Sequence, residues 1–289
     1  MRGEGNKKMT KGNRFEFGKN WINFLSRLDE TRILEAERSL KQMLELKSLE
    51  GKTFLDIGSG SGLFSLAARR LGAKVYSFDY DSLAVECTAK LKRCYFPDDR
   101  SWSVQQGDIL NVDYLKSLDT FDIVYSWGVL HHTGAMWQAL ENVVPLVGKG
   151  GKLFISIYND QGDASRRWRA LKEFYNCSSK PVKLIIILGI GVMSQTYAAL
   201  VRLYRGQNPL PFKAWADKKK NRGMSVWHDL VDWVGGYPFE VAKPEEIFDF
   251  YRMQGFTLVK LKTCGGGLGC NEYVFIKKQI GLFLKTEVY

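Results

Sequence analysis

Residues 53–62 read T-F-L-D-I-G-S-G-S-G, and this stretch predicts how the chain folds around it. Leu55 and Ile57 are apolar, as expected of a buried parallel strand, and Asp56 stands near the end of that strand. Glycines follow at every second position, at Gly58, Gly60 and Gly62. Residues 63–71 then read as a helix. A strand that passes through glycines into a helix presents bare backbone N–H groups and a helix N-terminus to a ligand.

A second apolar strand, at residues 75–78, ends in Asp79, 17 residues after Gly62. An acid at this place can accept hydrogen bonds from both hydroxyls of a ribose. The acid followed by Gly-x-Gly-x-Gly, together with Asp79, resembles the class I S-adenosylmethionine (SAM)-dependent methyltransferases. An NAD-binding Rossmann domain would favour Gly-x-Gly-x-x-Gly, which does not stand here. The resemblance implies SAM as the cofactor and S-adenosylhomocysteine as the product.

The resemblance also implies which residues hold the cofactor. In the family, an acid after the third strand hydrogen-bonds the adenine amino group and the next residue packs on the ring, which points to Asp108 and Ile109. Trp127, after the fourth strand, stands where the family places an apolar cofactor contact. In the family, N-terminal segments cover the ligand, which points to Trp21. The complete predicted cofactor set is Asp56, Gly58, Gly60, Gly62, Asp79, Tyr80, Asp108, Ile109, Trp127 and Trp21.

Short apolar strands alternate with helices along most of the chain, which predicts a parallel sheet with helices on both faces. After the first two strands, the predicted strands are residues 101–106, 121–126, 152–158, 256–262 and 272–278. We therefore expect an α/β fold with a Rossmann-like, seven-stranded, mostly parallel sheet. The resemblance implies that the last strand is antiparallel, and the core is most similar to the ubiquinone-biosynthesis type of small-molecule O-methyltransferase.

The expected organisation is a methyltransferase core with an N-terminal helical lid and a largely helical insertion after the fifth strand. Its segments are a disordered basic tail at 1–14, the lid at 15–50, the core at 51–159 and 244–278, the insertion at 160–243 and a C-terminal tail at 279–289. The net charge of +11 is concentrated in the tail and the insertion. Such basic regions favour nucleic acid, anionic lipid or an acidic substrate, or are simply solvated.

The insertion contains residues 184–201, which run without a charge between Lys183 and Arg202. Three interpretations stay open: a buried or substrate-covering helix, a helix on an anionic membrane surface, and a membrane span. The five cysteines form no C-x-x-C pair, and no signal peptide is evident. We therefore expect the protein in the reducing cytoplasm, with peripheral attachment to the membrane as a further possibility. With three histidines in the chain, we expect no metal site.

A hydroxyl acceptor of a methyl group needs a base near neutral pH, and histidine suits that role. His131 and His132 follow the fourth strand, where the family brings the methyl donor and the acceptor together. His228 lies in the insertion beside Asp229, which could orient its ring. We therefore expect the catalytic residues among His228, His132, His131 and Asp229, with His228 ranked first.

The sequence thus predicts a SAM-dependent methyltransferase (EC 2.1.1.-) that methylates a hydroxylated or amino small or lipid-like molecule by in-line displacement. One alternative is a tRNA or other nucleic-acid methyltransferase, which the basic insertion favours. No N-P-P-Y-type sequence, which marks methylation of base amino groups, follows the fourth strand. Another alternative is a SAM-binding protein without catalysis. The acceptor and the oligomeric state are left open.

Overall fold

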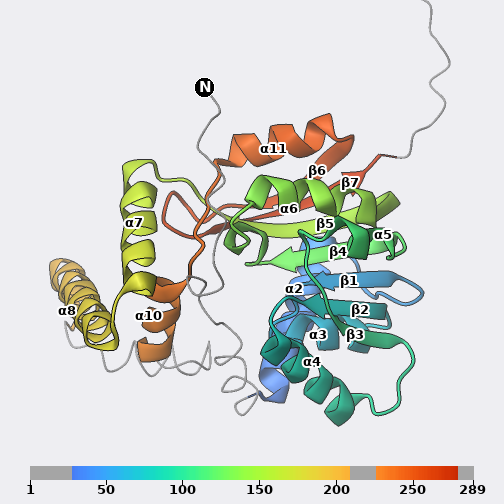
Figure 1. Ribbon diagram of the computed structural model, residues 1–289, viewed down its shortest axis with the longest axis horizontal. Helices are drawn as coiled ribbons and strands as arrows, with labels where there is room; N and C mark the ends of the chain where they lie inside the picture. Colours follow the sequence, from blue (N-terminus) through green and yellow to red (C-terminus); the bar gives the residue numbers. More distant parts are fainter. Residues whose placement is uncertain (1–27, 209–225, 279–289) are drawn as a thin grey trace, which may run out of the picture.

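A computed structural model describes residues 28–208 and 226–278, except the side chains of residues 226–229 and 232. Seven strands form one sheet in the order β3-β2-β1-β4-β5-β7-β6 (Figure 1). They are β1 (Thr53–Ile57), β2 (Lys74–Asp79), β3 (Trp102–Gln106), β4 (Phe121–Trp127), β5 (Val147–Tyr158), β6 (Phe256–Lys262) and β7 (Cys270–Lys277). β7 pairs antiparallel with β5 and β6, and the other pairs are parallel. The predicted sheet, including its antiparallel last strand, is confirmed.

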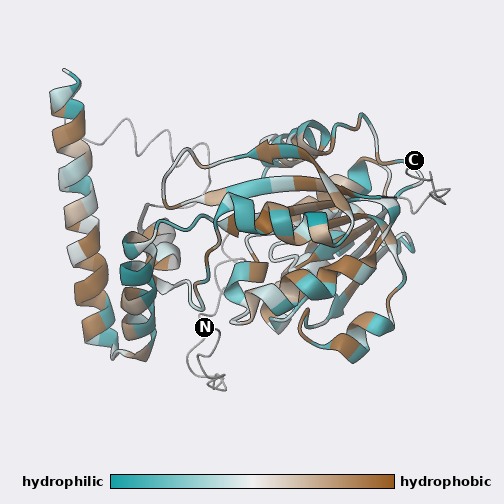
Figure 2. Cartoon of the chain, turned by 90° about the horizontal axis from the view of Figure 1, so that it is seen from above, coloured by the Kyte–Doolittle hydropathy of each residue, from teal (hydrophilic) through white to brown (hydrophobic). Residues whose placement is uncertain are grey.

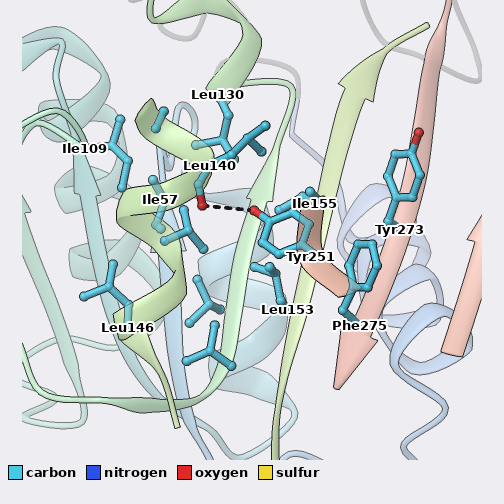
Figure 3. Close-up of a cluster of buried hydrophobic side chains, with 14 of the residues drawn as sticks. Ile57, Ile109, Leu130, Leu140, Leu146, Leu153, Ile155, Tyr251, Tyr273 and Phe275 are labelled. Carbon is cyan, nitrogen blue, oxygen red and sulfur yellow. Dashed lines mark hydrogen bonds between the residues drawn. The ribbon is translucent and has the colours of Figure 1, made fainter. Parts of the chain in front are cut away.

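Helices cover both faces of the sheet and divide the apolar core into two clusters. One face carries α2 (Glu30–Leu44), α3 (Leu63–Arg70) and α4 (Ser82–Tyr95), packed around the buried Leu66 and Trp102. The other face carries α5 (Val112–Lys116), α6 (Met136–Val143) and α11 (Pro244–Met253). There the hydroxyl of Tyr251 donates to the carbonyl of Leu140 at 3.3 Å (Figure 3).

Two of these helices have ends that their local sequence explains. Helix α2 ends at Leu44, where Glu45 adopts a left-handed conformation with φ of 54°. Its buried apolar side chains pack against α3, so this part of the predicted lid contributes to the core. Helix α6 is followed by a 3-10 turn (Val144–Leu146) that contains a proline.

The described residues of the insertion after β5 include three helices, which we call the helical arm: α7 (Asp163–Cys177), α8 (Lys180–Tyr204) and α10 (Val226–Gly235). They pack around a small cluster centred on Tyr175, Ile187 and Val234, to one side of the sheet (Figure 1). The expectation that residues 184–201 form a helix is confirmed, but that helix is not buried among the described residues, where only Ile187 of α8 lacks solvent contact. Two helices supply too little surface to enclose a third.

Both ends of the insertion meet at the carboxyl end of β5. Asn159 and Ala242 form an isolated parallel bridge. The N–H of Ala242 donates to the carbonyl of Tyr158 at 3.0 Å, and the N–H of Asp160 donates to the carbonyl of Ala242 at 3.1 Å. The arm therefore leaves and re-enters the core at one place.

Candidate active site at the carboxyl edge of the sheet

The glycine loop after β1 adopts backbone conformations that would be strained for any residue other than glycine. Gly58, Gly60 and Gly62 have φ values of 76°, 56° and 81°. A Cβ at Gly58 would lie 2.5 Å from the Cγ atoms of Val129, and one at Gly62 would lie 2.9 Å from the Cα of Thr88. The left-handed conformation and the lack of space both require glycine here. The loop is therefore packed directly against the segment that follows β4.

Asp79, at the end of β2, holds the glycine loop in place. One oxygen of its carboxylate accepts the N–H of Gly60 at 2.9 Å, and the other accepts the N–H of Asp81 at 2.9 Å. The carbonyl of Phe78 accepts the N–H groups of Gly58 and Ser59 at 2.8 and 3.1 Å. Asp79, predicted as a ribose contact, thus also sets the shape of the loop.

Asp56 is buried at the end of β1 and belongs to a chain of hydrogen bonds. The hydroxyl of Ser65 donates to its carboxylate, and Ser65 lies 2.7 Å from the hydroxyl of Ser77. The indole N–H of Trp102 donates to Ser77 at 2.9 Å. Burial raises the pKa of Asp56 to about 7; the negative charge of Asp79 acts in the same direction, and the hydrogen bond from Ser65 opposes it.

The remaining predicted cofactor residues lie at the ends of β2, β3 and β4. The side chains of Tyr80 and Trp127 are about half exposed, and a Cβ at Gly128 would meet only open space. Asp108 accepts the N–H of Leu110 at 2.9 Å. The side chain of Ile109 is buried in the core beside α6 (Figure 3), so little of it is presented at the surface. The structure therefore brings exposed aromatic groups and a glycine backbone to one edge.

His131 and His132 lie in a short 3-10 turn (Leu130–His132) after β4 and pack against the last residue of β5. The rings of His131 and Tyr158 are 4.1 Å apart, and those of His131 and His132 are 4.6 Å apart. Burial first, and the neighbouring His132 second, hold the pKa of His131 well below its usual range, so His131 is neutral near pH 7. Nδ1 of His132 lies 2.5 Å from the carbonyl of Pro238. Because a carbonyl can only accept, Nδ1 carries a proton, so in the neutral ring the lone pair is on Nε2.

Lys172 of α7 is a buried lysine that the sequence analysis did not single out. Its Nζ lies 4.5 Å from the ring centre of Trp233, 4.9 Å from that of Phe239 and 5.8 Å from that of Trp168. It also donates to the carbonyl of Trp233. Burial lowers its pKa to about 7. The rings of Trp233 and Phe239 contact Tyr158, so Lys172 joins the arm to the histidine turn.

The glycine-rich β6–β7 connection also lies at this edge. The side chain of Asn271 donates to Asn159 at 3.0 Å and accepts the N–H of Cys264 at 3.1 Å. The amide of Asn159 donates to the carbonyl of Gly267 at 3.3 Å. These bonds hold the loop against Asn159, at the carboxyl end of β5.

Three predicted site residues cannot be located. Trp21 lies outside the described residues. His228 and Asp229 belong to α10, but their side chains are outside the described part of the chain. Within the described ranges, no group of three His, Cys, Asp or Glu side chains could hold a metal ion.

Comparison with known proteins assigns the family. A family model described as a methyltransferase domain matches residues 28–182, more than half of the chain. The ribosomal protein L11 methyltransferase of Prochlorococcus marinus (strain MIT 9515) is 35% identical over 126 residues, covering 42% of this chain and 40% of that protein. The ubiquinone biosynthesis O-methyltransferase of Coxiella burnetii (strain Dugway 5J108-111) is 28% identical over 144 residues, covering 50% and 59%. The matches thus span about half the length of these curated relatives.

A solved structure shows the same fold over almost the whole chain. It is the magnesium protoporphyrin IX methyltransferase of Synechocystis PCC 6803 with bound SAH, with a TM-score of 0.52 and 12% identity, covering 90% of this chain and 94% of that one. At this identity the likeness concerns the fold alone. Together with the family match, it shows that the chain belongs to the methyltransferase domain family and has the class I SAM-dependent methyltransferase fold.

Proposed function

We propose that this chain transfers a methyl group from SAM to a hydroxylated or amino small or lipid-like molecule. The observation that carries this proposal is the packed aromatic cluster of His132, Tyr158, Trp233 and Phe239 at the carboxyl ends of β4 and β5. The glycine loop packs against Val129, three positions before His132, so this cluster stands beside the proposed cofactor site. Aromatic side chains with a few polar groups are typical of small-molecule sites.

The residues at the carboxyl edge fit SAM. We propose that Gly58, Gly60 and Gly62 give backbone access, and that Asp79 accepts hydrogen bonds from the ribose. The half-exposed Tyr80 and Trp127 would flank the ligand. Asp108 is proposed for the adenine amino group, and the buried Ile109 would contribute mainly through the backbone near it.

When bound, SAM supplies a methyl group that is already activated on a sulfonium. The protein must align the acceptor, exclude water and take up a proton where the acceptor carries one. His132 suits proton removal, because its bond to the carbonyl of Pro238 leaves the lone pair on Nε2. His131, neutral and buried, would position this ring. His228, oriented by Asp229, is the second proposed base.

The decisive experiment incubates the full chain with methyl-labelled SAM and a cell extract separated into lipid, RNA, protein and small-molecule fractions. Label in the lipid or small-molecule fraction is the expected result. His132→Gln and His228→Gln then identify the base, since the correct substitution lowers turnover at least a hundredfold and leaves SAM affinity within about twofold. SAM binding without transfer to any fraction would contradict the proposal and favour the non-catalytic alternative.

The nucleic-acid and protein alternatives make different predictions in the same assay. The basic insertion favours nucleic acid, and label in RNA with affinity that falls steeply with salt would support it. One curated relative is named for a ribosomal protein acceptor, so label in protein would support that class. All five cysteines are free thiols, which fits our proposal that the enzyme works in the reducing cytoplasm.

A further inference from the structure

Helix α8 keeps most of its apolar side chains in solvent. Among the described residues, twenty large apolar side chains are exposed, and nine of them lie on this helix of 25 residues. They are Leu184, Ile185, Leu188, Val192, Met193, Tyr197, Leu200, Leu203 and Tyr204. Its most apolar window is long enough to cross a membrane and is only 6% buried. So large an apolar surface marks a place of contact.

The inner side of α8 is already occupied by the rest of the helical arm. Ile187 is buried, and Ile186 and Ile190 pack against the cluster that includes Leu230. A Cβ at Gly191 would lie 3.1 Å from the side chain of Leu230, so α10 approaches the middle of α8 closely. The nine exposed side chains are therefore separate from this contact. Helix α8 is the outermost helix of the arm (Figure 2).

The charges on α8 itself have one sign, whereas the adjoining α7 also carries Glu173 and Asp163, which is paired with Arg166. Helix α8 contains no Asp or Glu. Basic residues stand at both of its ends and on the adjoining α7, namely Lys180, Lys183, Arg202, Arg205, Arg166, Arg167 and Arg169. Lys and Arg beside an exposed apolar face match the negative headgroups and the acyl boundary of an anionic bilayer.

We propose that α8 docks on an anionic membrane and lies in its plane, with the nine exposed side chains in the acyl boundary. The close approach of Leu230 to Gly191 argues against a span, because α10 would then be drawn to the middle of the bilayer. By sequence α10 contains Asp229 and Asp232, whose charges would be costly there. This docking does not depend on methyl transfer, although it would bring a lipid-like acceptor to the carboxyl edge of the sheet.

The test uses the full chain in co-sedimentation with phosphatidylcholine vesicles, with and without phosphatidylglycerol. The wild-type chain should sediment with the anionic vesicles, and less so as salt rises. The triple variant Ile185→Gln, Val192→Gln and Leu200→Gln should bind at least tenfold more weakly, because three apolar side chains lose their burial in lipid. Alkaline carbonate should extract the bound chain, as expected of a helix that does not span.

A matched control removes exposed apolar side chains from elsewhere on the molecule. Met253→Gln, Val259→Gln and Leu261→Gln change exposed residues of α11 and β6 and should leave vesicle binding unchanged. Circular dichroism and thermal melts of both triple variants establish that they fold.

Several results would overturn the proposal. One is a wild-type chain that stays in the supernatant with anionic vesicles at low salt. Another is an α8 variant that binds the vesicles as well as the wild type does. A self-associating chain that the α8 variant converts to a monomer, without vesicle binding, would instead identify a second copy as the occupant. Resistance to carbonate extraction would replace docking by a span.

Discussion

The glycine-loop edge and the helical arm use the same kinds of side chain in opposite ways. At the edge, Asp56 and Asp79 are bonded within the chain, and the apolar residues beneath them are buried. In the arm, a buried lysine is enclosed by aromatic rings while long apolar side chains of α8 face solvent. Among the described residues, the apolar side chains beneath the edge are covered, whereas those on the outside of α8 are not. This difference suggests that the edge holds the cofactor and the arm meets the surroundings.

The largest effect is expected from Gly58→Ala, which places a Cβ against Val129. The glycine loop must shift, so SAM binding should weaken by a hundredfold or more, measured by isothermal titration calorimetry. Gly51→Ala is the matched control, because Gly51 has φ of 70° with nothing within 4 Å of an added Cβ. That variant should lose about 1 kcal/mol of stability and keep its affinity. Equal affinities in the two variants would contradict a steric role for Gly58.

Asp79→Ala should weaken SAM binding about thirtyfold, because the N–H groups of Gly60 and Asp81 lose a charged acceptor and the ribose would lose its partner. Asp113→Ala, at an exposed position on α5, should change the dissociation constant less than twofold. If both variants bind SAM equally well, Asp79 does not organise the site.

Lys172→Met tests the buried cation of the arm through the pH dependence of stability. The pKa of Lys172 is lowered to about 7 in the folded chain, so the unfolded chain binds more protons between pH 7 and about 10. The free energy of unfolding of the wild type should therefore rise with pH across this window, by at most about 1.4 kcal/mol per pH unit, relative to the variant. Denaturant titrations at several pH values measure this. Lys180→Met, at an exposed lysine, should follow the wild-type curve.

Binding of SAM should release less than one proton per chain from the wild type, and Asp56→Asn should abolish this release. With a pKa of about 7, Asp56 is about half protonated at pH 7, and the positive charge of bound SAM would favour its ionisation. Calorimetry of SAM binding in two buffers with different ionisation enthalpies should show release by the wild type and not by the variant. The same release from the variant would assign the proton to another group.

The sheet could be predicted from the sequence because its information is local. The apolar runs around Leu55 and Ile57, and the glycines after them, specify a strand and a loop whatever the rest of the chain does. Asp79 was found in the same way, from its place at a strand end. Its bond to Gly60 was not predicted, because a backbone contact depends on the loop's conformation.

The arm could not be predicted to the same extent because its environment is set by distant residues. Lys172 lies in a basic helical stretch that reads as a solvated surface, yet it is enclosed by Trp233 and Phe239, more than sixty positions away. The apolar run of α8 predicted a helix, but whether a helix is buried depends on how many others pack on it. In the described part of the chain two helices pack on α8, and most of it stays exposed.

The bridge between Asn159 and Ala242 has a consequence for how such a chain can change over time. Because the insertion starts and finishes at neighbouring points of the backbone, its length and content can vary without shifting any strand. A different arm could replace this one while the glycine loop, Asp79 and the sheet keep their positions. Exchanging arms between chains of this kind is thus a practical way to redirect the same reaction to a new acceptor or a new cellular surface.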